Sequence, residues 1–264
     1  MEDFILSTQI LTEFNFVEPK KYKVRAIVFL VDSKKSNKLY EQELLGTKMQ
    51  DLVANAVNSV ETTFVMLSEK EDCFEKARQN IKDEDYTICL FSDTPLIKEN
   101  TILEILDYAQ TKGLDFCKMP RGFIVKSKNF VAGNIVLSAD VNFVDKQEFF
   151  CVFDENTLCQ AKSILRKRVL EKHLKNGVRL EDLNTIYIDN NVQIGKDVRV
   201  YQNCCLCGNT VIKDGATIKA NSIITDSVIG DKSCIISSYI VNSIIKENSI
   251  IGPFEKLVNK KEKK

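Results

Sequence analysis

The chain has 264 residues, of which 44% are hydrophobic, and its 37 basic and 37 acidic side chains give a formal charge of zero. This length and apolar fraction allow one large domain or two smaller ones, each with a buried core. A nucleic-acid partner would favour a strongly basic face, so the balanced charge argues against one.

The first residues, MEDFILSTQILTEF, carry acids where a signal peptide would carry basic residues. No apolar run approaches the roughly 18 residues of a membrane span. The nine cysteines have no framework spacing, which favours free thiols in a reducing cytoplasm. The close group Cys204, Cys205 and Cys207 has no CxxC pair and no nearby histidine, so we interpret these residues as core-filling rather than as zinc ligands. We expect a cytoplasmic protein with no membrane partner.

Residues 1–153 alternate predicted strands and helices. In chain order we expect a strand over 23–31, a helix over 48–60, a strand over 62–67, a helix over 73–81, a strand over 86–91 and a helix over 101–113. This order predicts a Rossmann-type parallel sheet with helices on its faces.

The stretch LFSDTPLI, residues 90–97, places Asp93 directly after the third predicted strand. Ligands of parallel sheets bind beyond the carboxyl ends of the strands, so topology alone makes Asp93 a site candidate. Its carboxylate suits Mg²⁺, which takes oxygen ligands. The alternative is that Asp93 caps the following helix or accepts hydrogen bonds from nearby backbone N–H groups.

Residues 154–178 are predicted to form a helix that links two domains. Asp154 or Asn156 can cap its start, and Asn176-Gly177 supplies its end. Its apolar face is expected to hold Leu158, Ala161, Leu165, Val169 and Leu174. We interpret the charged residues of its other face as solvated; they are Arg166, Lys167, Arg168, Glu171 and Lys172.

Residues 179–258 carry an internal repeat. Aliphatic residues recur at six-residue steps, with three five-residue steps among them; they are Ile188, Ile194, Val200, Leu206, Ile212, Ile218, Ile224, Ile229, Ile235, Ile240, Ile245, Ile251 and Leu257. A period of six indicates short strands separated by turns, three to a triangular coil, with about four coils stacked over 186–257. Such a prism has open ends and flat faces, which favours a symmetric partner. Residues 259–264 form a basic tail, which we expect to be solvated.

The repeat resembles the left-handed parallel β-helix of bacterial acyltransferases, in which trimers are usual. Three phrases extend the resemblance: Tyr187-Ile188-Asp189 after Gly177-Val178, then ITDSVIGD at 224–231, then IGPFEKL at 251–257. With LFSDTPLI, they are similar to the bacterial bifunctional UDP-N-acetylglucosamine pyrophosphorylase. That enzyme joins an N-acetylglucosamine-1-phosphate uridyltransferase domain to a β-helical glucosamine-1-phosphate acetyltransferase domain. The resemblance implies a truncated and degenerate relative, with a shortened nucleotidyltransferase-like domain before the β-helix.

Departures from the family pattern concern the nucleotide site. The family has a glycine-rich turn after its first strand, where backbone N–H groups approach the nucleotide phosphates. Here DSKKSNKLYEQELLGTKM follows Val31, with no glycine before Gly46. Lys34, Lys35 and Lys38 could still meet nucleotide phosphates, although a solvated loop is the alternative. The segment SEKEDCFEK, residues 68–76, also lacks the Gln and the Gly-Thr by which the family recognises uracil.

The resemblance pairs Asp93 with an Asn as the second Mg²⁺ ligand, and Phe153 stands at that position. A phenyl ring offers no oxygen, so Asp93 becomes a vestigial metal candidate, unless Asp154 or Asn156 substitutes after a shift in register. The segment between Asp93 and Phe153 is also too short for the family's sugar-binding half. The family's acetyl transfer uses a β-helix histidine, whereas the single histidine here, His173, falls on the linking helix, where we expect a surface position.

Three hypotheses follow. The first is a pseudoenzyme that has lost both activities and acts as an oligomeric, trimeric binding or regulatory protein, with a nucleotide or sugar phosphate as its candidate ligand. The second is a minimal sugar-phosphate nucleotidyltransferase that uses Asp93 and Mg²⁺. The third is a purely structural trimeric module.

Overall fold

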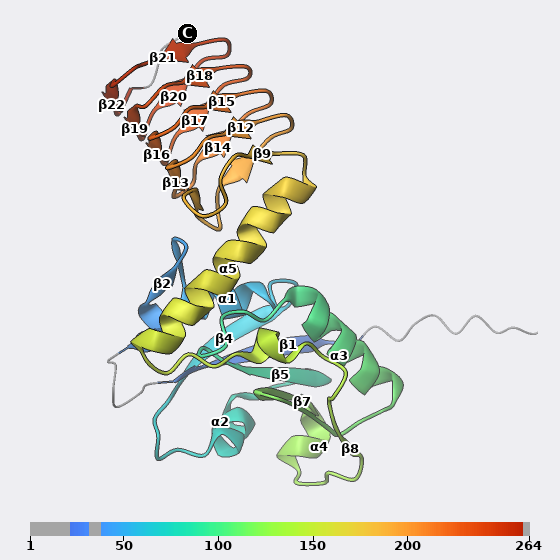
Figure 1. Ribbon diagram of the computed structural model, residues 1–264. Helices are drawn as coiled ribbons and strands as arrows, with labels where there is room; N and C mark the ends of the chain where they lie inside the picture. Colours follow the sequence, from blue (N-terminus) through green and yellow to red (C-terminus); the bar gives the residue numbers. More distant parts are fainter. Residues whose placement is uncertain (1–21, 32–37, 261–264) are drawn as a thin grey trace, which may run out of the picture.

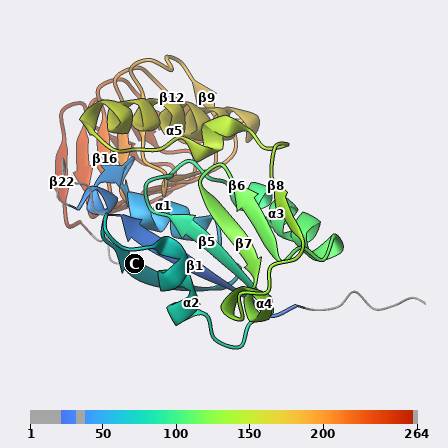
Figure 2. The ribbon, with the colours of Figure 1, turned by 90° about the horizontal axis from the view of Figure 1, so that it is seen from below.

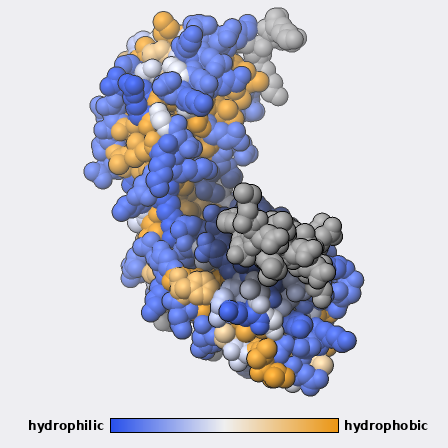
Figure 3. All heavy atoms as spheres, turned by 90° about the vertical axis from the view of Figure 1, so that its right-hand side faces the viewer, coloured by the Kyte–Doolittle hydropathy of each residue, from blue (hydrophilic) through white to orange (hydrophobic). Residues whose placement is uncertain are grey.

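The computed structural model describes residues 22–31 and 38–260. A mixed sheet with its helices lies at one end of the long helix α5, and a column of short stacked strands lies at the other (Figure 1). Figure 3 shows that the molecule narrows between these two parts. No helix of the described residues combines the length and apolar character needed to cross a lipid bilayer.

The sheet of the first part has six strands in the order β4-β1-β5-β7-β6-β8. Their bounds are β1 (Val24–Val31), β4 (Glu61–Leu67), β5 (Tyr86–Phe91), β6 (Phe116–Met119), β7 (Gly122–Lys126) and β8 (Ser138–Asp140). β4 and β5 pair in parallel with the two sides of β1, as the alternating order predicted. β7 runs antiparallel to both β5 and β6, and β8 runs parallel to β6. The predicted parallel arrangement is therefore confirmed for the first three long strands, and the sheet as a whole is mixed.

Helices cover both faces of this sheet (Figure 2). They are α1 (Met49–Asn55), α2 (Cys73–Asn80), α3 (Glu99–Thr111) and α4 (Ser127–Val131), with the 3-10 turns η1 (Leu39–Glu41) and η2 (Lys146–Phe149). Successive residues of β1 point to opposite faces. Ala26 and Val28 accordingly join a core with residues of α1 and α3, whereas Ile27 and Phe29 join a second core with residues of α2 and α4. The helix expected over 48–60 ends five residues early, at Asn55.

A two-stranded hairpin, β2 (Glu43–Leu44) and β3 (Thr47–Lys48), connects the sheet to the column of strands. Its turn places Leu45 at φ 47° and Gly46 at φ 70°, the left-handed region that a tight hairpin requires. The backbone N–H of Asn190 donates to the Leu45 carbonyl at 3.0 Å. A Cβ on Gly46 would lie only 2.6 Å from Oδ2 of Asp189. The absence of a side chain at Gly46 therefore allows the hairpin to pack closely against the first strands of the β-helix.

Helix α5 (Glu155–Lys175) begins with a capping box, as predicted for Asp154. Asp154 accepts from the Thr157 backbone N–H at 2.8 Å, while the Thr157 hydroxyl lies 3.0 Å from the Asp154 N–H. Leu158, Ala161, Leu165 and Val169 are buried, as expected. The assignment of Leu174 to this face is wrong: Leu174 is exposed, and Leu170 and His173 take the buried positions near the end of the helix.

The second part is a parallel β-helix made of three sheets. Its strands are β9 (Arg179–Leu180), β10 (Tyr187–Ile188), β11 (Gln193–Ile194), β12 (Arg199–Val200), β13 (Cys205–Cys207), β14 (Val211–Ile212), β15 (Thr217–Ile218), β16 (Ile223–Thr225), β17 (Val228–Ile229), β18 (Cys234–Ile235), β19 (Tyr239–Val241), β20 (Ile244–Ile245), β21 (Ile250–Ile251) and β22 (Lys256–Val258). They stack as β10-β13-β16-β19-β22, β11-β14-β17-β20 and β21-β18-β15-β12-β9.

The predicted aliphatic ladder fills the interior of this prism. In the first sheet Ile188 pairs with Leu206, Leu206 with Ile224 and Ile224 with Ile240, and all four side chains are buried. The step from Ile224 to Ile240 spans two fewer residues than the step from Leu206 to Ile224, yet the register holds. The shortened repeats are therefore absorbed at the corners, where Asp226, Ser237 and Asn242 adopt positive φ.

Candidate functional site

The carboxyl ends of β1 and β5 mark the place where the sheet topology predicts a site. β4 and β5 lie on opposite sides of β1. The chain therefore leaves β1 toward one side of the sheet, to β4, and then crosses to the other side, to β5, so the strand order reverses between β1 and β5. In open α/β sheets, ligands bind outside the strand ends at such a switch point. Asp93 follows β5 by two residues and lies at this edge.

Asp93 is bound by an arginine that the sequence analysis did not identify. Arg121 donates from Nε to Oδ1 of Asp93 at 3.2 Å and from Nη2 to Oδ2 at 2.7 Å. The guanidinium carbon also lies 4.1 Å from the centroid of the Phe91 ring. Both carboxylate oxygens thus face one planar cation, and this cation is itself stacked on the last residue of β5.

Arg121 comes from the tight turn between β6 and β7, in the antiparallel half of the sheet. Burial opposes its charge, but the hydrogen bonds that Arg121 donates to Asp93 and the negative charge of Asp93, with smaller contributions from Cys151 and Cys73, together outweigh burial and raise the pKa of the guanidinium above its usual value. The arginine therefore stays charged. A divalent cation at Asp93 would meet this positive charge at contact distance. The expectation that Asp93 caps the next helix is wrong, because the N-cap of α3 is Lys98.

Phe153, at the position where the resemblance implies a second metal ligand, is 57% exposed. The two substitutes considered from the sequence have other partners. Asp154 caps α5 through Thr157, and the amide oxygen of Asn156 accepts from Gln160 Nε2 at 3.4 Å. The Asp93 carbonyl accepts from the Val152 N–H at 2.7 Å, which fixes this segment beside Asp93.

The nucleotide-binding lysines predicted from the sequence lie around residues 34–38. Lys34 and Lys35 fall outside the described residues. Lys38 precedes η1, and its Nζ lies 3.2 Å from Oε1 of Glu41, three residues on. The charge of Lys38, which was predicted to meet nucleotide phosphates, therefore faces the carboxylate of Glu41.

His173 is buried, which contradicts the expected surface position. Only 3% of the residue is exposed, and its Nδ1 atom is buried with no hydrogen-bond partner among the described residues. Burial, and then the charge of Lys172, lower the pKa of the imidazole below its usual value. Its place on the inner face follows from the buried Val169 four residues earlier, a helical spacing that could have been used.

Two arginines of α5 that we expected to be solvated hold the helix in place. Arg166 Nη2 lies 2.9, 2.6 and 2.8 Å from the carbonyl oxygens of Leu183, Asn184 and Ile186, which lead into the β-helix. Arg168 Nη1 donates to the Leu96 carbonyl at 2.6 Å, in the sheet part. The solvated interpretation is wrong for both, because each anchors the helix to a different part of the molecule.

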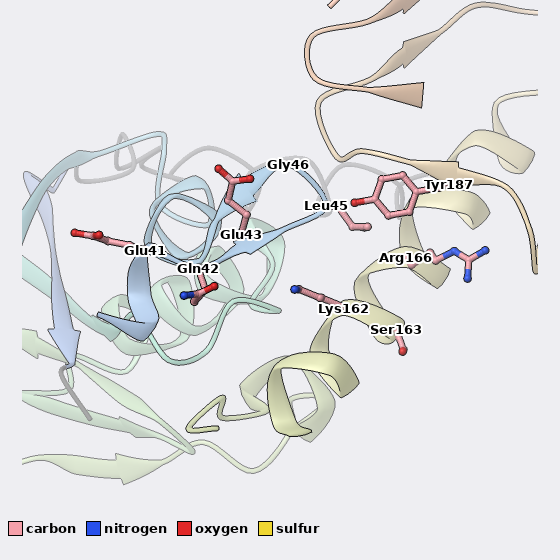
Figure 4. A pocket seen from close by; sticks show the side chains of 9 residues that line it. All are labelled: Glu41, Gln42, Glu43, Leu45, Gly46, Lys162, Ser163, Arg166 and Tyr187. Carbon is pink, nitrogen blue, oxygen red and sulfur yellow. The ribbon is translucent and has the colours of Figure 1, made fainter. Parts of the chain in front are cut away.

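A cavity of about 930 Å³ lies where the hairpin, α5 and the first β-helix strands meet (Figure 4). Its walls carry acidic, basic and apolar groups from three distant segments; they are Glu41, Gln42, Glu43, Leu45, Gly46, Lys162, Ser163, Arg166 and Tyr187. Asp93 and Arg121 do not line it. Sequence reasoning missed this cavity because only the tertiary structure brings its walls together.

Within the described parts of the chain, no three His, Cys, Asp or Glu side chains are grouped so that they could hold a metal ion. Cys204 is buried and bonds backbone carbonyls, consistent with the core-filling interpretation. Cys205 and Cys207 instead point outward from β13, with their sulfur atoms 3.3 Å apart.

No family model matches the chain. Among curated proteins it is similar to bifunctional protein GlmU of Clostridium botulinum, with 40% identity over 111 residues in one strain and 41% over 131 in another. These alignments cover 42% and 50% of the chain but only 24% and 27% of the relatives. GlmU of Clostridioides difficile is 28% identical over 67% of the chain and 53% of that protein. The chain thus spans about a quarter to a half of the length of the curated relatives it matches.

Solved structures similar to the chain include a molybdopterin-guanine dinucleotide biosynthesis protein A from Archaeoglobus fulgidus, with a TM-score of 0.43 and 13% identity. Another is a CMP:2-keto-3-deoxy-manno-octonic acid synthetase complexed with CTP, with a TM-score of 0.44 and 11% identity. They cover 54% and 55% of the chain and 99% of their own chains. The sequence similarity shows that this chain is a relative of GlmU proteins over about half of its length.

Proposed function

We propose that this chain is a GlmU-related protein that has lost uridyltransferase and acetyltransferase catalysis and acts as an oligomeric binding or regulatory protein. The bidentate pair between Asp93 and Arg121 carries the proposal. It occupies the carboxylate that would hold Mg²⁺ over a nucleotide.

The chemistry of Mg²⁺ explains why this pair matters. The ion requires near-octahedral oxygen coordination and gains most from anionic ligands. The guanidinium of Arg121 occupies both oxygens of Asp93. To bind there, Mg²⁺ would have to displace two charge-assisted hydrogen bonds and a cation that is stacked on Phe91. Phe153 supplies no oxygen, and Asp154 is engaged in capping α5. These contacts support the loss of the metal-dependent step.

Loss of acetyl transfer has a separate support. A general base must reach the proton it removes. His173, the single histidine of the chain, is buried near the C-terminal end of α5, next to the β-helix. Its lowered pKa follows from this burial and marks a core position.

The outward face of sheet β10-β13-β16-β19-β22 is our candidate for trimer formation. Ile223, Tyr239 and Val258 are exposed on it, beside the half-buried Thr225 and Val241. The sheet that contains β9 and β12 instead presents Arg179 and Arg199. Apart from the exposed Lys256, the outward side chains of this face are mainly apolar. Burying such a face against copies of itself is favourable, whereas burying the arginines would cost desolvation.

The test of catalysis uses UTP, N-acetylglucosamine 1-phosphate and Mg²⁺, with product detected by mass spectrometry. We expect no product above the protein-free control from the wild type. Turnover that Asp93→Asn abolishes would overturn the proposal in favour of a minimal nucleotidyltransferase. Mn²⁺ titration of the wild type and Arg121→Ala then tests the cause: we expect binding only when Arg121 has been removed.

The test of assembly compares two identical substitutions on different faces. Ile223→Glu places a charge on the candidate face, and Ile250→Glu places one on β21, where the native side chain is 74% exposed. Light scattering after gel filtration should give a trimer for the wild type and Ile250→Glu, and a monomer for Ile223→Glu. A monomeric wild type, or dissociation by Ile250→Glu alone, would contradict this assignment.

A further inference from the structure

A second cavity, of about 520 Å³, lies between the linking helix α5 and the sheet part of the molecule. One wall is a stripe of α5 at helical spacing, namely Ile164, Lys167, Arg168, Glu171, Lys172 and Lys175. The opposite wall comes from the sheet part and holds Lys98, Asp145 and Gln147. We refer to this cavity as the basic groove.

The charges of the basic groove do not cancel. Lys98 Nζ lies 2.5 Å from Glu148 Oε1, and Lys167 Nζ lies 4.0 Å from Glu171 Oε1. Asp145 uses its carboxylate to cap η2, where it accepts from the Gln147 N–H at 2.9 Å. Three cations then have no acidic partner among the described residues; they are Arg168, Lys172 and Lys175. The groove therefore holds an excess of positive charge in a chain whose net charge is zero.

Arg168 is held as a fixed donor at this wall. Its Nη1 donates to the Leu96 carbonyl at 2.6 Å, so the guanidinium cannot swing freely into solvent. Its Nη2 is buried and has no hydrogen-bond partner in the described part of the chain. A buried donor without an acceptor is unfavourable, and an oxyanion beside it would recover that loss.

We infer that the basic groove binds a compact phosphate-bearing anion, with Arg168 as the oriented donor and Lys172 and Lys175 as exposed cations at its rim. The small volume and the acidic residues Glu171 and Asp145 in its walls disfavour a long polyanion such as a nucleic acid. Pyrophosphate, a nucleotide, a sugar phosphate and a phospholipid headgroup share the required oxyanion. This site does not depend on the loss of catalysis at Asp93, because neither Asp93 nor Arg121 lines it.

The experiment measures pyrophosphate binding by isothermal titration calorimetry. Lys172→Glu/Lys175→Glu should weaken binding at least tenfold. The matched control Lys196→Glu/Lys213→Glu changes net charge equally at exposed lysines on the β-helix and should change the affinity less than twofold. Arg168→Lys, which keeps the charge but loses the planar fork, should also weaken binding. Circular dichroism checks that each variant is folded.

Further arms identify the source of the phosphate. UDP, glucose 1-phosphate and vesicles of phosphatidylglycerol are compared with pyrophosphate in the same buffer. Tighter binding of one soluble ligand identifies its class and supports the inference. Binding to vesicles alone identifies a phospholipid headgroup as the source. No binding of any of these phosphates, or equal weakening by both double variants, would overturn the inference.

Discussion

Arg121 places its guanidinium against both carboxylate oxygens of Asp93, at 3.2 and 2.7 Å, while its flat face covers the ring of Phe91. The residue that topology marks as the metal ligand is thus half of an internal ion pair. Its partner comes from the turn between two antiparallel strands.

A double-mutant cycle measures this pair. Asp93→Ala, Arg121→Ala and the double variant should give a coupling free energy of unfolding of about 1–2 kcal/mol, because the contact is bidentate and partly buried. Urea denaturation with at least two spectroscopic probes supplies the values. A coupling close to zero would mean that solvent screens the pair and that it does not restrain Asp93.

Gly46 tests the contact between hairpin and β-helix. Gly46→Ala should lower the free energy of unfolding by about 2–4 kcal/mol, since a Cβ there would lie 2.6 Å from Asp189 Oδ2 at φ 70°. Asp189 cannot easily yield, because Oδ2 already accepts from the Gly208 N–H at 2.9 Å.

Gly113→Ala is the matched control for that substitution. Gly113 has φ 63°, and a Cβ there would meet nothing within 4 Å, so this variant carries backbone strain alone and should cost about 1 kcal/mol. Equal losses in the two variants would show that the hairpin moves away from Asp189 without cost.

His173 should make stability depend on pH. Its folded pKa is lowered, so the unfolded chain takes up the proton first as pH falls. Above the unfolded pKa of about 6.5 the imidazole is neutral in both states, and the folded state keeps its full stability. As pH drops below this value, the unfolded chain binds the proton more readily, and the free energy of unfolding decreases. The midpoint of thermal unfolding should therefore fall between pH 7 and 5 more steeply for the wild type than for His173→Leu. Parallel profiles would contradict the burial of His173.

Cys205 should be the most reactive thiol of the β-helix at neutral pH. The hydrogen bond from Cys207 lowers the pKa of Cys205 to about 7, and burial opposes it. Iodoacetamide labelling, followed by peptide mass spectrometry, should titrate Cys205 near that pH. Cys207→Ala removes the donor and should move the titration toward the ordinary value of about 8.5. Trimer formation over this face would slow labelling without removing the difference, and an unchanged profile in Cys207→Ala would refute the assignment.

Local patterns were sufficient for much of the fold. The aliphatic repeat from Ile188 to Leu257 predicted the interior of the β-helix, because each inward position must be apolar for stacked coils to be stable. Asp154 and Gly177 marked the ends of α5, because caps satisfy backbone groups within one turn. The order of the first strands placed Asp93 at the carboxyl edge of the sheet.

What the sequence by itself determined was therefore the elements, their periodic cores and the position of Asp93. The tertiary structure decided what Asp93 touches, because Arg121 reaches it only through the antiparallel half of the sheet, for which the sequence has no periodic signal. It also decided that Arg166 and Arg168 bind backbone carbonyls and that His173 is buried, since a charged or polar helix residue takes its role from what packs against it. Periodicity arises within a segment, whereas a site is formed between segments, and only the folded chain brings those together.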